Sequence, residues 1–399
     1  MKWKIVILIS YLMCIVILTG CFDANELDQL AISLVVGLDL ENDKLLYTAE
    51  VIDLRYSSEG SGSINDVSVK YVQGTGNTVY EAFRDIPLKF GRRIYGAHIK
   101  AVIFGEDIAK KGLVPYMDVL FRSREIRESA YVIVAKGAKA YEVMGINSGS
   151  EQMPANYIVS VIESIEHNAK TIDTNIIDFI NYYYRMGQHP VTAVLEKKEK
   201  LALNHTGEET GTQEFELSSI GSAVFKNDIL VGYLNGNDTK SFNFILGNVN
   251  SGVITFPTPV EEDGNLFSFL VAIKVNTKND VLLENDRIIL KTKIKIKGYL
   301  GEVEGNIDIT KGENLEKMAE ACSKTVEEGI KSTVKKVQQE FGFDIFGFSH
   351  EFHKKYTNEW RKIEGNWDEI FAEADFEIEV DTDIISTGLL NKPLTVKEK

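Results

Sequence analysis

The chain opens with a short apolar segment that ends at Cys21, and this segment decides where the folded body can start. Lys2 and Lys4 precede a nearly uninterrupted apolar run over residues 5–18. As a helix this run would rise only about 21 Å, less than a hydrocarbon core of roughly 30 Å. A basic amino terminus, an apolar run of this length and small residues before a cleavage site are together typical of a cleaved secretory signal. We therefore expect residues 1–20 to be removed and the folded body to begin at Cys21.

The residues at the predicted cleavage site indicate that Cys21 is modified with lipid. Leu18-Thr19-Gly20-Cys21 resembles the bacterial lipobox, in which the cysteine sulfur is acylated before the peptide is cut between Gly20 and Cys21. Two acyl chains anchor stably, whereas a single chain would exchange. No later apolar run approaches the roughly 18 residues of a spanning helix. We predict a protein held on the outer face of a membrane by a covalent diacylglycerol on Cys21, with no other cofactor. The alternative is a plain signal peptide, or an uncleaved anchor, with an incidental cysteine.

Acidic residues outnumber basic ones, which excludes one class of partner. The chain has 59 Asp and Glu against 44 Lys and Arg, a formal net charge of −15. Such a surface repels nucleic acid phosphates and anionic lipid headgroups. Nucleic acid is therefore not expected as a partner, and the lipid must hold the protein on the membrane.

Cysteine usage limits what can stabilise the body. Cys14 leaves with the signal and Cys21 is acylated, so Cys322 is the one thiol that remains. A disulfide scaffold and a cysteine-based metal site are therefore excluded. Cys322 lies on the apolar stripe of a long helix predicted over about 314–340, so we expect a buried packing residue and not a reactive thiol.

Short β-type runs alternate with helical ones, which predicts an α+β, multi-domain protein. The amino-terminal domain is expected over 21–197, because the chain turns charged and polar from Glu196 onward. A linker and a strand-rich middle region follow over 198–263, with a hairpin about Asn227-Asp228. The carboxyl-terminal domain is expected over 264–399 and contains the long helix.

Two strands of the carboxyl-terminal domain carry complementary charges. Every second residue from Lys291 to Lys297 is a lysine, and every second residue from Glu377 to Asp383 is acidic. Both patterns are typical of half-buried strands with one wet face. Because opposite charges on facing strands stabilise a sheet, we predict that the two strands are neighbours.

The sequence signatures of common enzymes are absent. There is no nucleophile elbow or phosphate-binding loop, and Gly74-Thr75-Gly76 lacks the third glycine of a dinucleotide fingerprint. His350-Glu351-Phe352-His353 places two imidazoles three residues apart, but the sequence offers no third ligand for zinc. We expect no metal site and no enzymatic activity.

Several sequence blocks follow the predicted lipobox. They are Gly96-Ala97-His98, residues 104–112, residues 121–127, residues 221–228 with 230–234, residues 338–348 with Asp344-Ile345-Phe346-Gly347-Phe348, and Trp360, Trp367, Phe371 and Gly388. Together these blocks resemble the Ger(x)C family, the lipoprotein C subunits of spore germinant receptors. They follow the family's order from the lipobox nearly to the end of the chain. Ser349 departs from the family pattern, which has a second glycine there, and Phe22 replaces the tryptophan common after the lipid cysteine.

The resemblance implies a function, a location and partners. Members are non-catalytic subunits that act with two membrane-embedded partners, the A and B subunits, in the inner membrane of dormant spores. There they help nutrients to trigger germination, and the nutrient pocket is attributed mainly to the membrane partners. The implied fold is three α+β domains, each with a sheet and helices.

The same blocks supply candidate interaction residues. The charged ones either face a partner or form a salt-bridged layer that holds a helix on its sheet, and we favour the structural role because structural ion pairs are common. For Trp360 and Trp367 we likewise favour a role in the hydrophobic core over a role as interface hot spots. The charged candidates are His98, Glu106, Arg122, Arg124 and Arg127.

Two other functions share the signal. A lipid-anchored solute-binding protein of a transport system is the main alternative, and it would show two α/β lobes with a ligand cleft between them. An envelope hydrolase would need a nucleophile or metal constellation, which the sequence does not supply.

Overall fold

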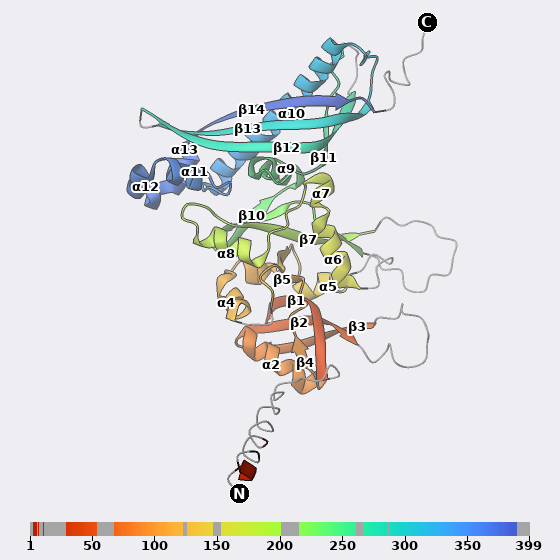
Figure 1. Cartoon of the computed structure of the whole chain (residues 1–399), viewed down its shortest axis with the longest axis vertical. Coiled ribbons are helices and arrows are strands. Elements are labelled where there is room, and N and C mark those ends of the chain that lie inside the picture. The colour runs from red at the N-terminus through yellow and green to blue at the C-terminus, as the bar shows by residue number, and fades with distance from the viewer. Residues whose placement is uncertain are drawn as a thin grey trace, which may run out of the picture.

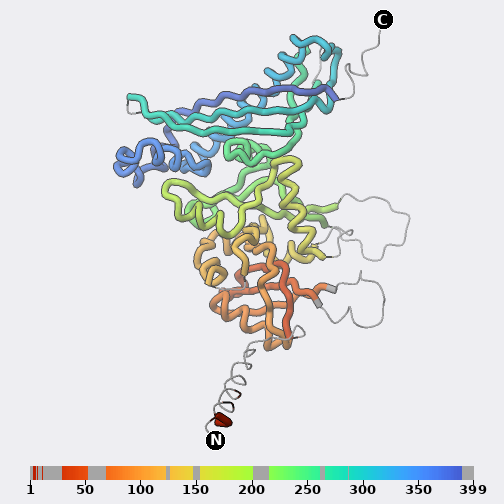
Figure 2. Tube along the Cα trace, in the orientation of Figure 1, coloured from red at the N-terminus to blue at the C-terminus, as the bar shows by residue number. Residues whose placement is uncertain are grey.

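In the part of the chain that the structure describes, two β-sheets are flanked by helices, so the predicted α+β class is confirmed. The computed structural model describes residues 3–5, 7, 11, 29–53, 68–122, 126–146, 153–200, 215–260, 266–285 and 287–388. The molecule is elongated, with the start of β1 near one end and the carboxyl-terminal sheet at the other (Figure 1). Strands and helices therefore follow one another along the long axis roughly in chain order (Figure 2).

The first sheet has ten strands in the order β10-β9-β7-β6-β5-β1-β2-β3, with β4 paired to β1 and β8 paired to β7. Its central part is parallel: β1, β5, β6 and β7 run the same way, as strands joined by helical crossovers do. The strands are β1 (Leu30–Glu41), β2 (Lys44–Asp53), β3 (Ser68–Gly76), β4 (Arg93–Tyr95), β5 (Ala101–Gly105), β6 (Tyr131–Ala135), β7 (Val191–Glu199), β8 (Phe215–Ser218), β9 (Ser222–Lys226) and β10 (Ile229–Leu234).

Helices cover both faces of this sheet. One face packs under α2, α4 and α8, and the other under α5 and α6, so β5 and β6 are buried on both sides. Local signals set the helix ends: Thr78 accepts a hydrogen bond from the Glu81 N–H at the start of α2, and Gly91 ends it in the left-handed conformation. The helices are α2 (Val79–Phe90), α3 (Glu106–Ala109), α4 (Val114–Arg122), α5 (Ala140–Met144), α6 (Pro154–Glu163), α7 (Ile165–Asn168) and α8 (Ile176–Tyr184).

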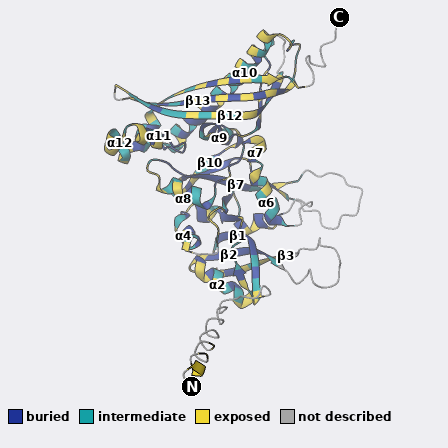
Figure 3. Cartoon of the chain, viewed as in Figure 1, coloured by how far each residue is buried: buried dark blue, intermediate teal, exposed yellow. Residues whose placement is uncertain are grey.

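The second sheet has four strands in the order β11-β12-β13-β14. One face is buried against α9 and the long α10, and along the strands buried and exposed residues alternate (Figure 3). The elements are α9 (Gly236–Leu246), β11 (Gly252–Pro257), β12 (Phe267–Glu284), β13 (Arg287–Val303), α10 (Gly312–Lys336), a π-helical turn (Val337–Phe341), α11 (Phe348–Lys355), α12 (Thr357–Ile363), a short 3-10 turn (Glu364–Asn366), α13 (Trp367–Glu373) and β14 (Asp375–Ser386).

Three local predictions are confirmed. The predicted hairpin is β9–β10, which turns at Asn227 in the left-handed conformation. The predicted long helix is α10, continued by the π-helical turn, and Cys322 on it is fully buried. The lysine-rich β13 and the acidic β14 are neighbours and run parallel, with Lys291 opposite Glu377 and Lys297 opposite Asp383.

Ion pairs cross between these two strands at 2.7 Å (Lys291–Glu377), 2.8 Å (Lys293–Glu379) and 3.1 Å (Lys297–Asp383). We expect Lys293→Glu to lower the free energy of unfolding by about 1 kcal/mol, because it sets two carboxylates side by side. Adding Glu379→Lys should recover most of that loss, and high salt should shrink it. Urea denaturation measures both effects. If neither Glu379→Lys nor high salt reduces the loss of unfolding free energy, the ion pairs between β13 and β14 do not stabilise the sheet electrostatically.

The predicted domain ranges 21–197, 198–263 and 264–399 stay a prediction. Strands on both sides of residue 197 share the ten-stranded sheet, since β9 pairs with β7 across Thr192 and Ala223. The core on the α5–α6 face also continues into the second sheet without a break. Within the described residues, no helix combines the length and apolar composition that crossing a bilayer requires.

Candidate functional site

The charged candidates from the sequence do not gather in one place. Glu106 starts α3, accepts a hydrogen bond from the Gly137 N–H and pairs with Lys110 at 2.5 Å. Arg122 ends α4 and forms an exposed pair with Asp118 at 2.7 Å. The remaining candidates are His98, exposed with its ring edge toward Tyr95, and Arg127, exposed after α4; Arg124 lies outside the described residues, as do Gly20 and Cys21. Their roles toward a partner stay predictions.

The two tryptophans, in contrast, lie together inside the molecule. Trp360 of α12 and Trp367 of α13 are each 1% exposed, and their ring centroids are 5.4 Å apart. Phe352 of α11 packs against both. They form the core of a small helical unit, and that unit contacts the first sheet through the polar groups described next.

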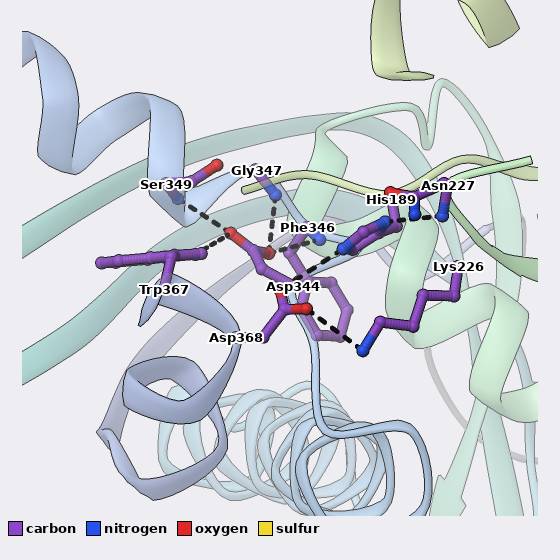
Figure 4. A network of polar contacts seen from close by, with 9 residues as sticks. All are labelled: His189, Lys226, Asn227, Asp344, Phe346, Gly347, Ser349, Trp367 and Asp368. Atoms are coloured by element: carbon purple, nitrogen blue, oxygen red, sulfur yellow. Dashed lines mark hydrogen bonds and ion pairs between the residues drawn. The ribbon is translucent and has the colours of Figure 1, made fainter. Parts of the chain in front are cut away.

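A buried carboxylate organises the turn that leads into this unit. Asp344 is fully buried, and its carboxylate accepts hydrogen bonds from the N–H groups of Phe346 (2.8 Å), Gly347 (2.9 Å) and Ser349 (2.8 Å). The Trp367 indole N–H donates to it at 3.3 Å (Figure 4). The Asp344 side chain therefore caps the start of α11 and ties it to α13.

Burial outweighs these donors and raises the pKa of Asp344 to about 6, from 3.8. The folded protein therefore holds this proton more tightly than the unfolded chain, so the stability that Asp344 contributes falls as pH rises from about 4 through 6. We expect the difference in unfolding free energy between wild type and Asp344→Asn to shrink over that range, since an amide does not titrate. Urea midpoints at stepped pH measure it. A difference that stays flat or grows would show that Asp344 is not protonated in the fold.

His189 connects this turn to the first sheet. Its backbone N–H donates to the Asp344 carbonyl at 2.9 Å, and its ring lies edge-on to Phe343, 4.5 Å between centroids. The ring Nδ1 accepts from the Asn227 N–H at 2.9 Å, so the proton is on Nε2, which faces Asp368 Oδ1 at 3.3 Å.

Asp368 completes a second link between the two parts. Its other oxygen lies 3.3 Å from Lys226 Nζ at the end of β9. Although burial opposes it, the hydrogen bonds from His189 and Lys226 hold the pKa of Asp368 below its ordinary value. Asp368 is thus charged at neutral pH and joins α13 to the β9–β10 hairpin (Figure 4).

The hairpin turn extends these contacts to α4. The Asp228 carboxylate accepts from the Val114 N–H at 3.0 Å, and its carbonyl accepts from Leu113. Gly112 has φ +105, and a Cβ there would lie 2.8 Å from the Asp228 carboxylate. Glycine is therefore needed before α4 for two reasons, its backbone conformation and the space that Asp228 occupies.

Residues from four of the sequence blocks thus meet in one place, which we call the junction: Gly112, Asn227, Asp228, Asp344, Gly347, Trp360 and Trp367, together with His189, Lys226 and Asp368. The side chains of His189, Lys226, Asp344 and Asp368 each bind another residue of the junction. In the part of the chain that the structure describes, no group of three or more His, Cys, Asp or Glu could hold a metal ion. The junction is built to hold parts of the protein together.

His350 and His353, the pair considered for zinc, belong to no group of three or more possible metal ligands among the residues that the structure describes. His353 stacks on Trp360 at 5.5 Å, and burial lowers the pKa of His350. Sequence reasoning missed His189 and Asp368 altogether. The one available signal was Asp344 itself, an acidic residue just before a helix, which is a common capping pattern.

Family models match nearly the whole chain. The model described as spore germination protein N-terminal domain matches residues 23–197, and the one described as spore germination B3/GerAC like, C-terminal, matches residues 220–388. Spore germination protein B3 of Bacillus subtilis (strain 168) is 26% identical over 384 residues, 94% of this chain and 96% of the relative. Spore germination protein KC of the same strain is 25% identical over 406 residues, 98% of each chain.

A solved structure shares the fold. The crystal structure of the GerBC protein superposes with a TM-score of 0.54 at 22% identity, over 88% of this chain and 96% of that one. The two family models thus match, in the family's order, most of the chain from β1 to β14. The chain belongs to the Ger(x)C, or GerAC-like, family of spore germination proteins.

Proposed function

We propose that the chain is the lipid-anchored, non-catalytic C subunit of a spore nutrient germinant receptor. Diacylglycerol on Cys21 would hold it on the outer face of the spore inner membrane, next to the membrane-embedded A and B subunits. Neither nucleic acid nor a cofactor beyond the lipid belongs to this function.

One observation carries the proposal. The two family models match in order over 23–197 and 220–388, and the first begins two residues after the lipobox cysteine. The predicted secretory signal and lipid site therefore lie directly before the matched germination domain.

The test is germination of spores that carry Cys21→Ala. We expect the protein to leave the membrane fraction and the spores to lose one nutrient response, as spores without the gene do, because the body has lost its two acyl chains. Germination rates under a panel of nutrients, with membrane fractionation, measure both. The matched control is Cys322→Ala, which removes the buried thiol and should keep membrane attachment.

A different result would point elsewhere. Deletion spores that respond normally to every nutrient, in a strain without a second copy of the family, would contradict the receptor role. Cys21→Ala protein that stays in the membrane fraction would contradict the lipid anchor.

A further inference from the structure

The chain enters its folded body at a defined end of the molecule. Leu30, the first residue of β1, pairs with Arg93 of β4, and Ile32 pairs with Tyr95. Figure 1 shows β4 and α2 together at this end, and the second sheet at the opposite end. From Cys21 to Leu30 the chain can span at most about 30 Å. A lipid on Cys21 therefore keeps the α2–β4 end close to the bilayer.

The outward side of α2 at this end carries residues that suit a membrane surface. Tyr80, Arg84 and Leu88 follow one another at four-residue spacing, opposite the buried side of the helix. Leu88 is 85% exposed and Tyr80 is 54% exposed. The Arg84 guanidinium donates to the Tyr80 hydroxyl at 2.7 Å and lies 5.1 Å from its ring centroid. Exposed leucine, tyrosine and arginine together are typical of a bilayer interface.

Charge at this end differs from that of the chain as a whole. From α2 to the end of β4 the basic residues are Arg84, Lys89, Arg92 and Arg93. The acidic residues are Glu81, which accepts a hydrogen bond from the Asn77 N–H, and Asp85, which pairs with Lys89 at 2.5 Å. The whole chain carries −15. The segment before β1 holds Asp23, Glu26 and Asp28, so contact with an anionic surface depends on Leu88 and Tyr80 as well as on charge.

We propose that this face, made of Tyr80, Arg84, Leu88, Lys89, Arg92 and Arg93, rests on the headgroup layer of the membrane that holds the lipid anchor. The proposal rests on the proposed lipid anchor and adds an orientation to it. Leu88 and the Tyr80 ring enter the apolar boundary of the headgroups, and the basic side chains bind anionic phosphates. The −15 charge of the whole chain keeps the remaining surface away from the bilayer, so the long axis stands up from the membrane.

The test places a tryptophan on the face of the lipidated protein. Leu88→Trp protein is incorporated into vesicles of phosphatidylcholine and phosphatidylglycerol with brominated acyl chains, which quench nearby indoles. We expect strong quenching of the new indole at position 88. The control is Ile385→Trp, at a position 52% exposed on β14 at the far end of the molecule, which should stay bright. Trp360 and Trp367 are buried and give an equal background in both proteins.

Charge is tested on the same reporter. Adding Arg92→Glu and Arg93→Glu should weaken contact with anionic vesicles by roughly tenfold or more, and should change little in pure phosphatidylcholine. Lys324→Glu with Lys335→Glu on α10 is the matched charge control and should leave quenching unchanged.

Failures of the two proposals separate cleanly. Protein that does not float with the vesicles contradicts the lipid anchor. Protein that floats, with the indole of Leu88→Trp as bright as the indole of Ile385→Trp, contradicts the membrane-facing orientation alone. Quenching that requires the A and B subunits in the vesicles would show that the face binds a protein partner, and would also overturn the lipid contact.

Discussion

Asp344→Ala is expected to lower the free energy of unfolding by about 5 kcal/mol at neutral pH. The substitution leaves three backbone N–H groups and the Trp367 indole N–H without an acceptor in a fully buried site. A buried donor without a partner keeps its full desolvation cost, and four of them meet here. Because the Asp344 side chain caps α11 and ties it to α13, the loss also weakens the packing of α11 against α13. Urea denaturation of the purified protein measures the change.

The control is Asp118→Ala, which removes an acidic residue from an exposed ion pair and should cost less than about 1 kcal/mol. Spores that carry the two variants extend the comparison to function. The Asp344 variant should accumulate poorly and germinate slowly, whereas the Asp118 variant should behave as wild type. If Asp344→Ala were as mild as the control, the carboxylate would not be the organising group of the junction.

Sequence reasoning succeeded where a pattern is local or where two patterns match. Alternating lysines on one strand and alternating acidic residues on the other were enough to pair β13 with β14. The alternation within each strand identifies its solvent-exposed face and the charge on that face. The stripe that includes Cys322 likewise identified the buried side of α10, since helical periodicity sorts residues by side. In both cases the physical signal lies within one element.

The junction could not be found in this way. His189 and Asp368 are 179 residues apart, and nothing around either residue indicates the other. Their contact exists because the segment just before β7 and helix α13 come together in the tertiary structure. Trp360 and Trp367 were correctly predicted as core residues because tryptophan is usually buried. The contact between Trp367 and the Asp344 carboxylate, however, forms only in the folded chain and could not be predicted.

Gly74 belongs to the glycine motif that was compared with a dinucleotide-binding fingerprint, and the structure gives it a role in packing. Gly74-Thr75-Gly76 lies at the end of β3, where α2 crosses the strand. A Cβ on Gly74 would overlap the Ala82 carbonyl oxygen and would lie 2.8 Å from the Ile86 side chain. The backbones of strand and helix approach so closely that only glycine fits. The Thr75 N–H also donates to Asp85 of the same helix at 2.9 Å, which fixes the register of α2 on β3.

We therefore expect Gly74→Val to lower the free energy of unfolding by about 4 kcal/mol, because α2 must move away from the sheet and uncover Ala82 and Ile86. The matched control is Gly312→Ala at the start of α10, where no atom lies within 4 Å of the new Cβ. That substitution should be neutral or stabilise the protein by up to about 1 kcal/mol, since it restricts the unfolded chain. Urea midpoints compare the two. Equal stability of both variants would mean that α2 shifts on the sheet at little cost, and that the close contact at Gly74 does not hold it in place.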